Sequence, residues 1–242
     1  MSTLVKAVIA TTGLGLLAYQ LFRRNRDDDE CTGDKVKNGV SMSRYKNGAI
    51  HTVAHKKDGK LNGVCIQNYS SGSPKSVANY VEDLLHGRFT SFYPSGRLRS
   101  EVDYEMGKCT RVVSLYDHAG RDCVLGDGEQ TVWKVAVTDS RVPVYVRLTV
   151  PENAKRVTPD DGDHKLYKAR VEFAKVEEIF DREGNRYQKA FSAIHYRYPV
   201  TYNVGEVVGP DFFNADPSVQ CGNGIHVHRY KDHCDQWEVW GM

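Results

Sequence analysis

The chain has little excess charge and no dense cysteine framework. Of its 242 residues, 33 are Lys or Arg and 31 are Asp or Glu, which leaves a net charge of +2. This balance gives no general attraction to nucleic acid, so we expect no nucleic-acid partner. The six cysteines are scattered through a chain of this length, which favours free thiols in a reducing compartment over a disulfide scaffold.

Short catalytic motifs are also missing: the sequence has no P-loop, no GxSxG and no HExxH. The densest set of chemically useful side chains lies in the tail and comprises Cys221, His226, His228, His233 and Cys234. Cysteine and histidine are zinc donors, but this spacing matches no standard zinc finger. We expect no metal and no cofactor here, with a hydrogen-bonded, semi-buried His226 and the other four side chains at the surface. Cys221 with His226 as a nucleophile and base is the alternative.

The N-terminus carries one long apolar stretch, from Leu4 to Phe22, in which Lys6 is the only charge. Nineteen residues at about 1.5 Å each reach about 28 Å, close to the roughly 30 Å core of a bilayer. The stretch lacks the basic start and small-x-small cleavage site of a signal peptide, and a buried core helix would not end in a charge cluster. The sequence therefore predicts a single-span anchor over residues 1–26. Arg23, Arg24 and Arg26 place the bulk of the chain on the cytosolic side.

After an apolar-poor linker over residues 27–41, glycines recur at a constant interval over residues 42–126. One series is Gly48, Gly72, Gly96 and Gly120; a second contains Gly59 and Gly107, with Asp83 between them. Aromatic residues precede them by three positions: Tyr45, Tyr69 and Tyr93 in the first series, Tyr80 and Tyr104 in the second. A fixed period of this length indicates a repeat architecture.

Each half-repeat combines an alternating stretch, an aromatic, turn-type residues and a glycine. Leu98, Val102 and Tyr104 share one face of such a stretch while charges take the other. We expect one hairpin per repeat, stacked into a long antiparallel sheet in which equivalent tyrosines stack and the glycines make turns. At Gly120 the nearest aromatic, Tyr116, lies four positions back, so we expect the ladder to slip by one position and hand over to another domain there.

Residues 127–242 lose the period and read as a compact, mostly β domain with one or two short helices. We expect a long strand from Lys168 to Phe180, a hairpin turn at residues 181–185, and further strands over residues 187–194, 198–208 and 224–228.

Two known families resemble parts of this chain. Leu84 to Lys108, with His86-Gly87 and the equivalent Asn62-Gly63, resembles the MORN-type repeat in its bacterial antitoxin-like variant. That resemblance implies a scaffold for proteins or membranes without a catalytic constellation. The segments at residues 132–134, 148–156, 202–206 and 221–226 resemble an uncharacterised domain found behind repeats in giant DNA viruses, which implies a Marseillevirus-like source.

We therefore expect a non-enzymatic, membrane-anchored structural or interaction protein and virion component, single-pass and with protein partners. The alternatives are an antitoxin-like regulatory binder of another protein and an enzyme that uses the Cys221–His226 region.

Overall fold

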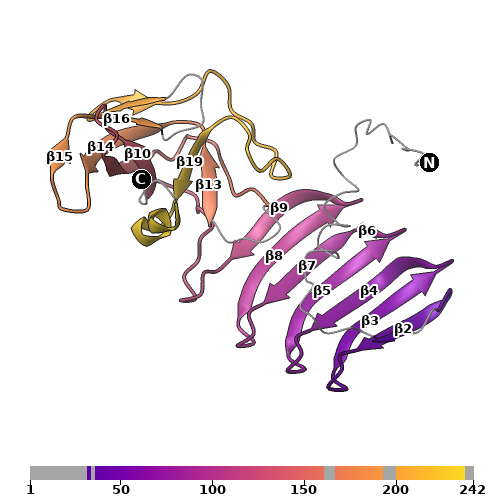
Figure 1. The fold of residues 1–242 in the computed structure, drawn as a ribbon. Helices are drawn as coiled ribbons and strands as arrows, with labels where there is room; N and C mark the ends of the chain where they lie inside the picture. The colour runs from indigo at the N-terminus through magenta and orange to yellow at the C-terminus, as the bar shows by residue number, and fades with distance from the viewer. Residues whose placement is uncertain (1–31, 34–35, 161–166, 193–199, 238–242) are drawn as a thin grey trace, which may run out of the picture.

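A computed structural model describes residues 32–33, 36–160, 167–192 and 200–237. These residues form two antiparallel sheets, a long one from the N-terminal half and a more irregular one from the C-terminal half (Figure 1). The expected mainly β, antiparallel fold is thus confirmed. No helix within the described ranges is long and apolar enough to cross a membrane. The expected span from Leu4 to Phe22, with the whole anchor over residues 1–26, lies outside those ranges.

The first sheet is a row of strands in which each pairs with its neighbour along the chain, with the short β6 beside β5 (Figure 1). Its strands are β1 (Thr32–Gly33), β2 (Gly39–Arg44), β3 (Ile50–Lys57), β4 (Lys60–Asn68), β5 (Pro74–Val81), β6 (Leu84–Leu85), β7 (Gly87–Phe92), β8 (Leu98–Glu105) and β9 (Lys108–Leu115).

The sheet begins earlier than the sequence predicts. Residues 27–41 were expected to form a linker because they are poor in apolar side chains, yet β1 and the start of β2 fall within them. Thr32 pairs with Arg44, and Val40 pairs with His55 of β3. An edge strand is held by backbone hydrogen bonds to one neighbour, so it needs no buried apolar face and leaves no periodic signal.

Alternate hairpins close with two residues that both have positive φ, the pattern of a type I′ turn. These pairs are Asp58-Gly59, Glu82-Asp83 and Met106-Gly107. Each of these turns also forms a hydrogen bond to the preceding repeat. The amides of Gly59, Asp83 and Gly107 donate to the carbonyls of Lys37, Leu61 and Leu85, respectively. Each acceptor lies nearly one full repeat before its donor, so these bonds join one repeat to the next.

The other hairpins close with the expected aromatic-x-x-Gly turns. In each, the glycine amide donates to the tyrosine carbonyl three positions back, at 2.8–2.9 Å for Gly48, Gly72 and Gly96. The tyrosine hydroxyls then reach forward to a backbone carbonyl in the next repeat. Tyr45 donates to Asn68 at 2.8 Å, Tyr69 to Phe92 at 2.8 Å and Tyr93 to Tyr116 at 2.7 Å. This hydroxyl-to-carbonyl bond, which we call the tyrosine staple, is therefore the contact that recurs from one repeat to the next. The sequence had predicted stacking of the tyrosine rings instead.

The last turn does not slip. Gly120 donates to the carbonyl of Asp117 at 2.9 Å, and the amide of Asp117 donates to Arg121, as Tyr93 does to Arg97. Asp117 therefore occupies the tyrosine position of a fourth turn, in register with Tyr93. The expected slip from Tyr116 is wrong, because the repeat keeps its backbone and changes only the side chain at that position.

The second sheet runs in the order β12-β13-β19-β10-β11-β14-β15, with β16, β17 and β18 on side branches. Its strands are β10 (Gln130–Val137), β11 (Pro143–Val150), β12 (Arg156–Val157), β13 (Lys168–Val171), β14 (Ala174–Phe180), β15 (Arg186–Tyr187), β16 (Lys189–Ser192), β17 (Thr201–Asn203), β18 (Val207–Val208) and β19 (Ile225–His228). A 3-10 helix, η1 (Lys231–Gln236), follows β19. The buried core is formed by apolar side chains of β10, β11, β13, β14, β16, β17 and β19, together with Leu125 and Ala154.

The predicted long strand from Lys168 to Phe180 is wrong, because the structure divides it into β13 and β14. At the break, Glu172 donates its amide to the carbonyl of Lys155 at 2.8 Å. The two halves also have different neighbours: β13 lies between β12 and β19, while β14 pairs with β11, β15 and β18. Alternation continues across the break, so the side-chain pattern does not reveal the change of partners.

Two arginines on adjacent strands hold the loops of this sheet. Arg156 of β12 donates to the carbonyls of Gly126 and Gly128 at 2.7 and 2.8 Å, and to three more in residues 151–154. Arg170 of β13 is fully buried and donates to the carbonyls of Asn214, Asp216 and Val219 at 2.7–3.0 Å. Satisfied guanidinium groups of this kind are well tolerated when buried.

The Gly222-Asn223-Gly224 motif makes room for Arg170. A Cβ at Gly224 would lie 2.3 Å from Cγ of Arg170, and one at Gly222 would lie 3.1 Å from its Cζ. Gly224 is therefore required by close packing and also has a φ of +148°, while Gly222 is packed tightly against Asn214 and Arg170.

We expect Gly224→Ala to destabilise the protein more than Gly205→Ala. Both positions have positive φ, but a Cβ at Gly205 would meet nothing within 4 Å. Gly205→Ala should cost about 1 kcal/mol from backbone conformation alone, and the overpacking against Arg170 should add roughly 1–3 kcal/mol for Gly224→Ala. Urea unfolding of both variants measures the difference, and equal losses would contradict the packing role of Gly224.

Candidate functional site at the junction of the two sheets

The two sheets meet at the β9 end of the repeat region, where side chains from both halves share one core. Buried residues of β8 and β9 pack with Cys123 and Tyr167, and Tyr230 packs against the same cluster. Polar contacts cross the junction as well. The hydroxyls of Tyr93 and Tyr167 lie 3.0 Å apart, and Tyr104 donates to the buried carboxylate of Asp160.

At the centre of this junction, Asp117 makes a different contact from the tyrosines at the same position of earlier turns. The residue is 3% exposed. One carboxylate oxygen accepts the amide of Arg121 at 2.8 Å, and the other accepts Nε of Arg121 at 2.7 Å and Nε2 of His233 at 3.1 Å. Arg121 also forms an ion pair with Asp232 on η1. Two residues of the last turn are therefore bonded to η1: Asp117 to His233, and Arg121 to Asp232.

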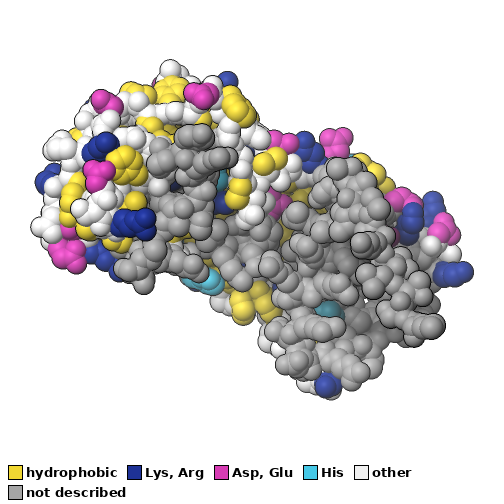
Figure 2. All heavy atoms as spheres, turned by 45° about the horizontal axis from the view of Figure 1, so that its top comes forward, with side chains coloured by type: hydrophobic (Ala, Val, Ile, Leu, Met, Phe, Trp, Pro, Cys, Tyr) yellow, Lys and Arg dark blue, Asp and Glu magenta, His cyan; other side chains and the backbone are white. Residues whose placement is uncertain are grey.

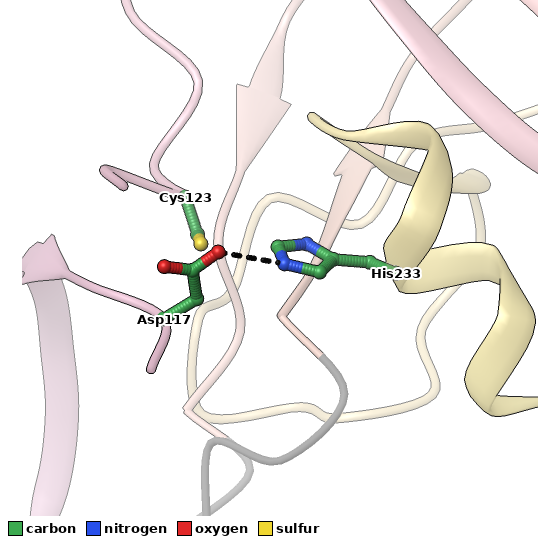
Figure 3. Close-up of side chains that lie close together, drawn as sticks. All are labelled: Asp117, Cys123 and His233. Carbon is green, nitrogen blue, oxygen red and sulfur yellow. Dashed lines mark hydrogen bonds and ion pairs between the residues drawn. The ribbon is translucent and has the colours of Figure 1, made fainter. Parts of the chain in front are cut away.

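The three side chains in Figure 3 come from two parts of the chain. Asp117 and Cys123 lie in the loop after β9, and His233 projects toward them from η1 (Figure 3). Because His233 Nε2 faces a carboxylate oxygen, we assign its proton to Nε2. Its Nδ1 atom is buried and has no hydrogen-bond partner in the described part of the chain. Burial lowers the pKa of His233, although Asp117 opposes that shift.

These three residues are also the one group of His, Cys, Asp and Glu donors that gathers within the described ranges, with donor atoms less than 4.8 Å apart. Their types suit zinc, but their surroundings do not fit it. The guanidinium of Arg121 lies 2.7 Å from the Asp117 oxygen and 3.2 Å from His233 Nε2, where a cation would have to bind. Burial raises the pKa of the Cys123 thiol to about 12, so that group stays protonated. The arrangement is an internal ion pair with a neutral imidazole.

The predicted tail residues are not brought together as one site. Of Cys221, His226, His228, His233 and Cys234, only His233 belongs to the three-residue group. His226 is half-buried and its Nε2 lies 3.0 Å from the carbonyl of Gly222, as expected. The expectation of surface positions for the others is wrong for three of them: His228 and His233 are each 3% exposed and Cys234 is fully buried. They are buried because β19 is inserted between β13 and β10, with η1 packed beside it.

His228 is held neutral by its neighbours. Trp237 donates its indole N–H to Nε2 at 2.8 Å, so the proton lies on Nδ1, 3.3 Å from the carbonyl of Tyr167. Burial lowers the pKa of His228 to about 3 and that of His226 to about 4. Cys221 is exposed, and its sulfur lies 3.9 Å from Nζ of Lys168. His226 bonds to the backbone, so the geometry described does not pair it with Cys221 as a base.

Sequence reasoning missed Asp117, Arg121, Arg156 and Arg170. Asp117 was detectable, since it lies one repeat interval after Tyr93 in an otherwise intact turn. The arginines gave no signal, because their partners are backbone carbonyls or residues distant in the chain.

The fold and the junction define a protein in which a β-hairpin repeat sheet is joined to a second, irregular antiparallel sheet. Residues 121–234 match a family of unknown function (DUF5758). The match begins at Arg121 and ends at Cys234, so it takes in all the strands of the second sheet and the junction residues Cys123 and His233. No curated protein matches the chain.

We expect Asp117→Asn to destabilise the protein by about 1.5–3 kcal/mol, because it removes the charge that two donors share in a buried site. Asp122→Asn is the matched control: its carboxylate is 47% exposed and pairs with Arg229 at 2.8 Å, so its loss should cost less than about 1 kcal/mol. Urea unfolding of both variants provides the measurement. Similar losses would show that Asp117 has no special place at the junction.

We also expect stability to fall between pH 6.5 and pH 4. The folded-state pKa values of His226, His228 and His233 are lowered, so in this window the unfolded chain binds protons that the folded chain does not. Each group can remove up to about 1.4 kcal/mol per pH unit. The lowered pKa of Asp117 acts in the same direction only at lower pH, below its ordinary value of 3.8.

The free energy of unfolding at several pH values tests this dependence. His228→Gln should reduce the slope by about one proton, because glutamine can both accept from Trp237 and donate to Tyr167 without titrating. His118→Gln, at an exposed position, removes one histidine outside this buried group and is the matched control. A wild-type stability that is flat from pH 6.5 to pH 4 would refute the assignment.

Proposed function

We propose that the chain is a non-enzymatic, membrane-anchored structural or interaction protein whose MORN-like repeat sheet is the scaffold for contacts with other proteins. The observation that carries the proposal is the tyrosine staple, made three times at the interval of the glycine ladder. Repeats tied in this way give an extended, regular surface, which is how repeat proteins present binding faces.

One face of the repeat sheet supports a contact role. Met42, Val53, Ile66 and Val77 are register partners across β2 to β5, so they form one row of aliphatic side chains. All four are partly exposed. On β7 and β8, Arg88 pairs with Asp103 and Glu101. An apolar row bordered by charge pairs is a surface that a protein partner can cover.

The surface charge supports proteins over nucleic acid as partners. On the face drawn in Figure 2, basic and acidic side chains of the described residues are interspersed without a large area of one sign. Nucleic-acid sites need a concentration of basic side chains.

The use of reactive side chains favours a non-enzymatic role. Burial raises the pKa of Cys123 and of Cys234 to about 12, which keeps both thiols from acting as nucleophiles at neutral pH. His226 and His228 are bonded to backbone carbonyls. The two thiols and two imidazoles are therefore used to stabilise the folded structure.

The anchor and the source complete the proposal. The apolar stretch from Leu4 to Phe22 would span the membrane once and leave the two sheets on the cytosolic side. The resemblance to giant-virus repeat proteins supports a virion component of a Marseillevirus-like virus.

We expect the full-length chain, expressed in cells, to float with membranes in a density gradient and to resist carbonate extraction. A double variant, Leu14→Arg with Leu17→Arg, should lose both properties, because each charge in a bilayer core costs about 2.5–3.5 kcal/mol. Ser71→Arg with Ser95→Arg adds the same charge in exposed turns and should behave as wild type. A wild-type chain that stays in the soluble fraction would overturn the anchor. Cross-linking of purified virions then tests location and partners.

A further inference from the structure

A groove of about 250 Å³ lies beside the junction, between the two sheets. On one side it is lined by four successive residues of β9, Thr110 to Val113. On the other side it is lined by three successive residues, Arg156 to Thr158, which begin with β12. Neither stretch takes part in the contacts of Asp117.

The consecutive numbering shows which part of each strand faces the groove. Successive side chains of a strand point to opposite faces of its sheet, so a pocket on a face is lined by alternate residues. A pocket lined by every residue in turn lies along the strand's edge, where backbone N–H and C=O groups point outward. The groove is therefore bordered by two strand edges.

Both edges are open within the described ranges. β9 is the last strand of the first sheet and pairs only with β8; β12 is the first strand of the second sheet and pairs only with β13. The C-terminal end of β9 is closed, because Cys123 donates its amide to the carbonyl of Leu115 at 2.7 Å. The open stretch is thus about four residues long, or roughly 13 Å of strand.

The groove has fixed walls. Asp127 lies on one wall, in the loop that Arg156 holds through the carbonyls of Gly126 and Gly128. Ala215 and Pro217 lie on another, in the loop that Arg170 holds. Walls that are ordered before a ligand arrives reduce the entropy cost of binding.

We propose that this groove binds an extended segment of a partner protein, which adds as a strand to the open edge of β9. An exposed strand edge is complemented by another extended backbone, and sheet extension by a peptide is a known mode of recognition. Val113, Val124 and Val157 contribute apolar side chains to a lining that is otherwise largely polar, so the segment should carry apolar side chains where it faces these valines. This inference rests on the proposed interaction role and gives that role a specific site.

The probe is a displayed library of random heptapeptides, selected on the full-length protein in detergent. Enriched peptides are synthesised, their Kd values are measured by fluorescence anisotropy, and amide hydrogen exchange is compared with and without peptide. Ala215→Trp is the blocking variant, since Ala215 is exposed and lines the groove, so a large side chain fills the groove without entering the core. Gln220→Trp is the control, at an exposed position of the same loop region outside the lining.

The proposal expects slower exchange at those amides of Thr110–Val113 that point away from β8. It also expects at least tenfold weaker binding to Ala215→Trp, and less than a twofold change for Gln220→Trp. Failure to enrich a peptide, or binding that Ala215→Trp leaves intact, would overturn it. Protection in the free monomer of those amides of Thr110–Val113 that point away from β8 would overturn it as well, because it would mean that the chain covers its own edge. A dimer in sedimentation that Ala215→Trp dissociates would overturn it too, by assigning the edge to a second copy. Membrane flotation is independent of all these outcomes, so failure of the anchor and failure of the groove remain distinguishable.

Discussion

The buried carboxylate of Asp117 is the interaction on which the joining of the two sheets depends. It stands where earlier repeats carry a tyrosine, and the turn around it keeps the same backbone hydrogen bonds. A tyrosine at that position would reach forward to a further repeat. The carboxylate instead bonds Arg121 and His233, and through Arg121 it is linked to Asp232 on η1. Within an unaltered turn geometry, the change of side chain thus replaces a contact between repeats with a contact to the second sheet.

In the second sheet, two buried or half-buried arginines hold the loops in place through hydrogen bonds. Arg156 and Arg170 each direct a planar group of donors at backbone carbonyls of loops that have no regular structure of their own. Loops that expose their carbonyls in a core are costly unless these groups are bonded. The side chains therefore replace the ladder that a regular strand would supply, and the glycines at positions 222 and 224 leave the space that Arg170 needs.

The same architecture leaves two strand edges facing a groove with ordered walls. Edges on a protein surface invite uncontrolled pairing with other chains. Here they border a groove that lies between the two sheets, which is where we propose that an extended segment binds. The repeat sheet thus offers two kinds of surface for the contacts that we propose: an aliphatic row on one face and a strand edge beside the junction.

The sequence by itself determined the repeat, because a constant period places glycines and tyrosines at turns whose backbone requires positive φ or a capped end. It also indicated a mostly β C-terminal region and the half-buried His226. It did not determine that the segment from Lys168 to Phe180 divides into two strands, because the alternation of side chains does not show which strand each part pairs with. Nor did it determine the burial of His228, His233 and Cys234, which arises because β19 returns to the middle of the second sheet. Tertiary structure decided the role of Asp117, because its partner His233 lies 116 residues away in the chain and only packing of the two sheets brings them within 3.1 Å.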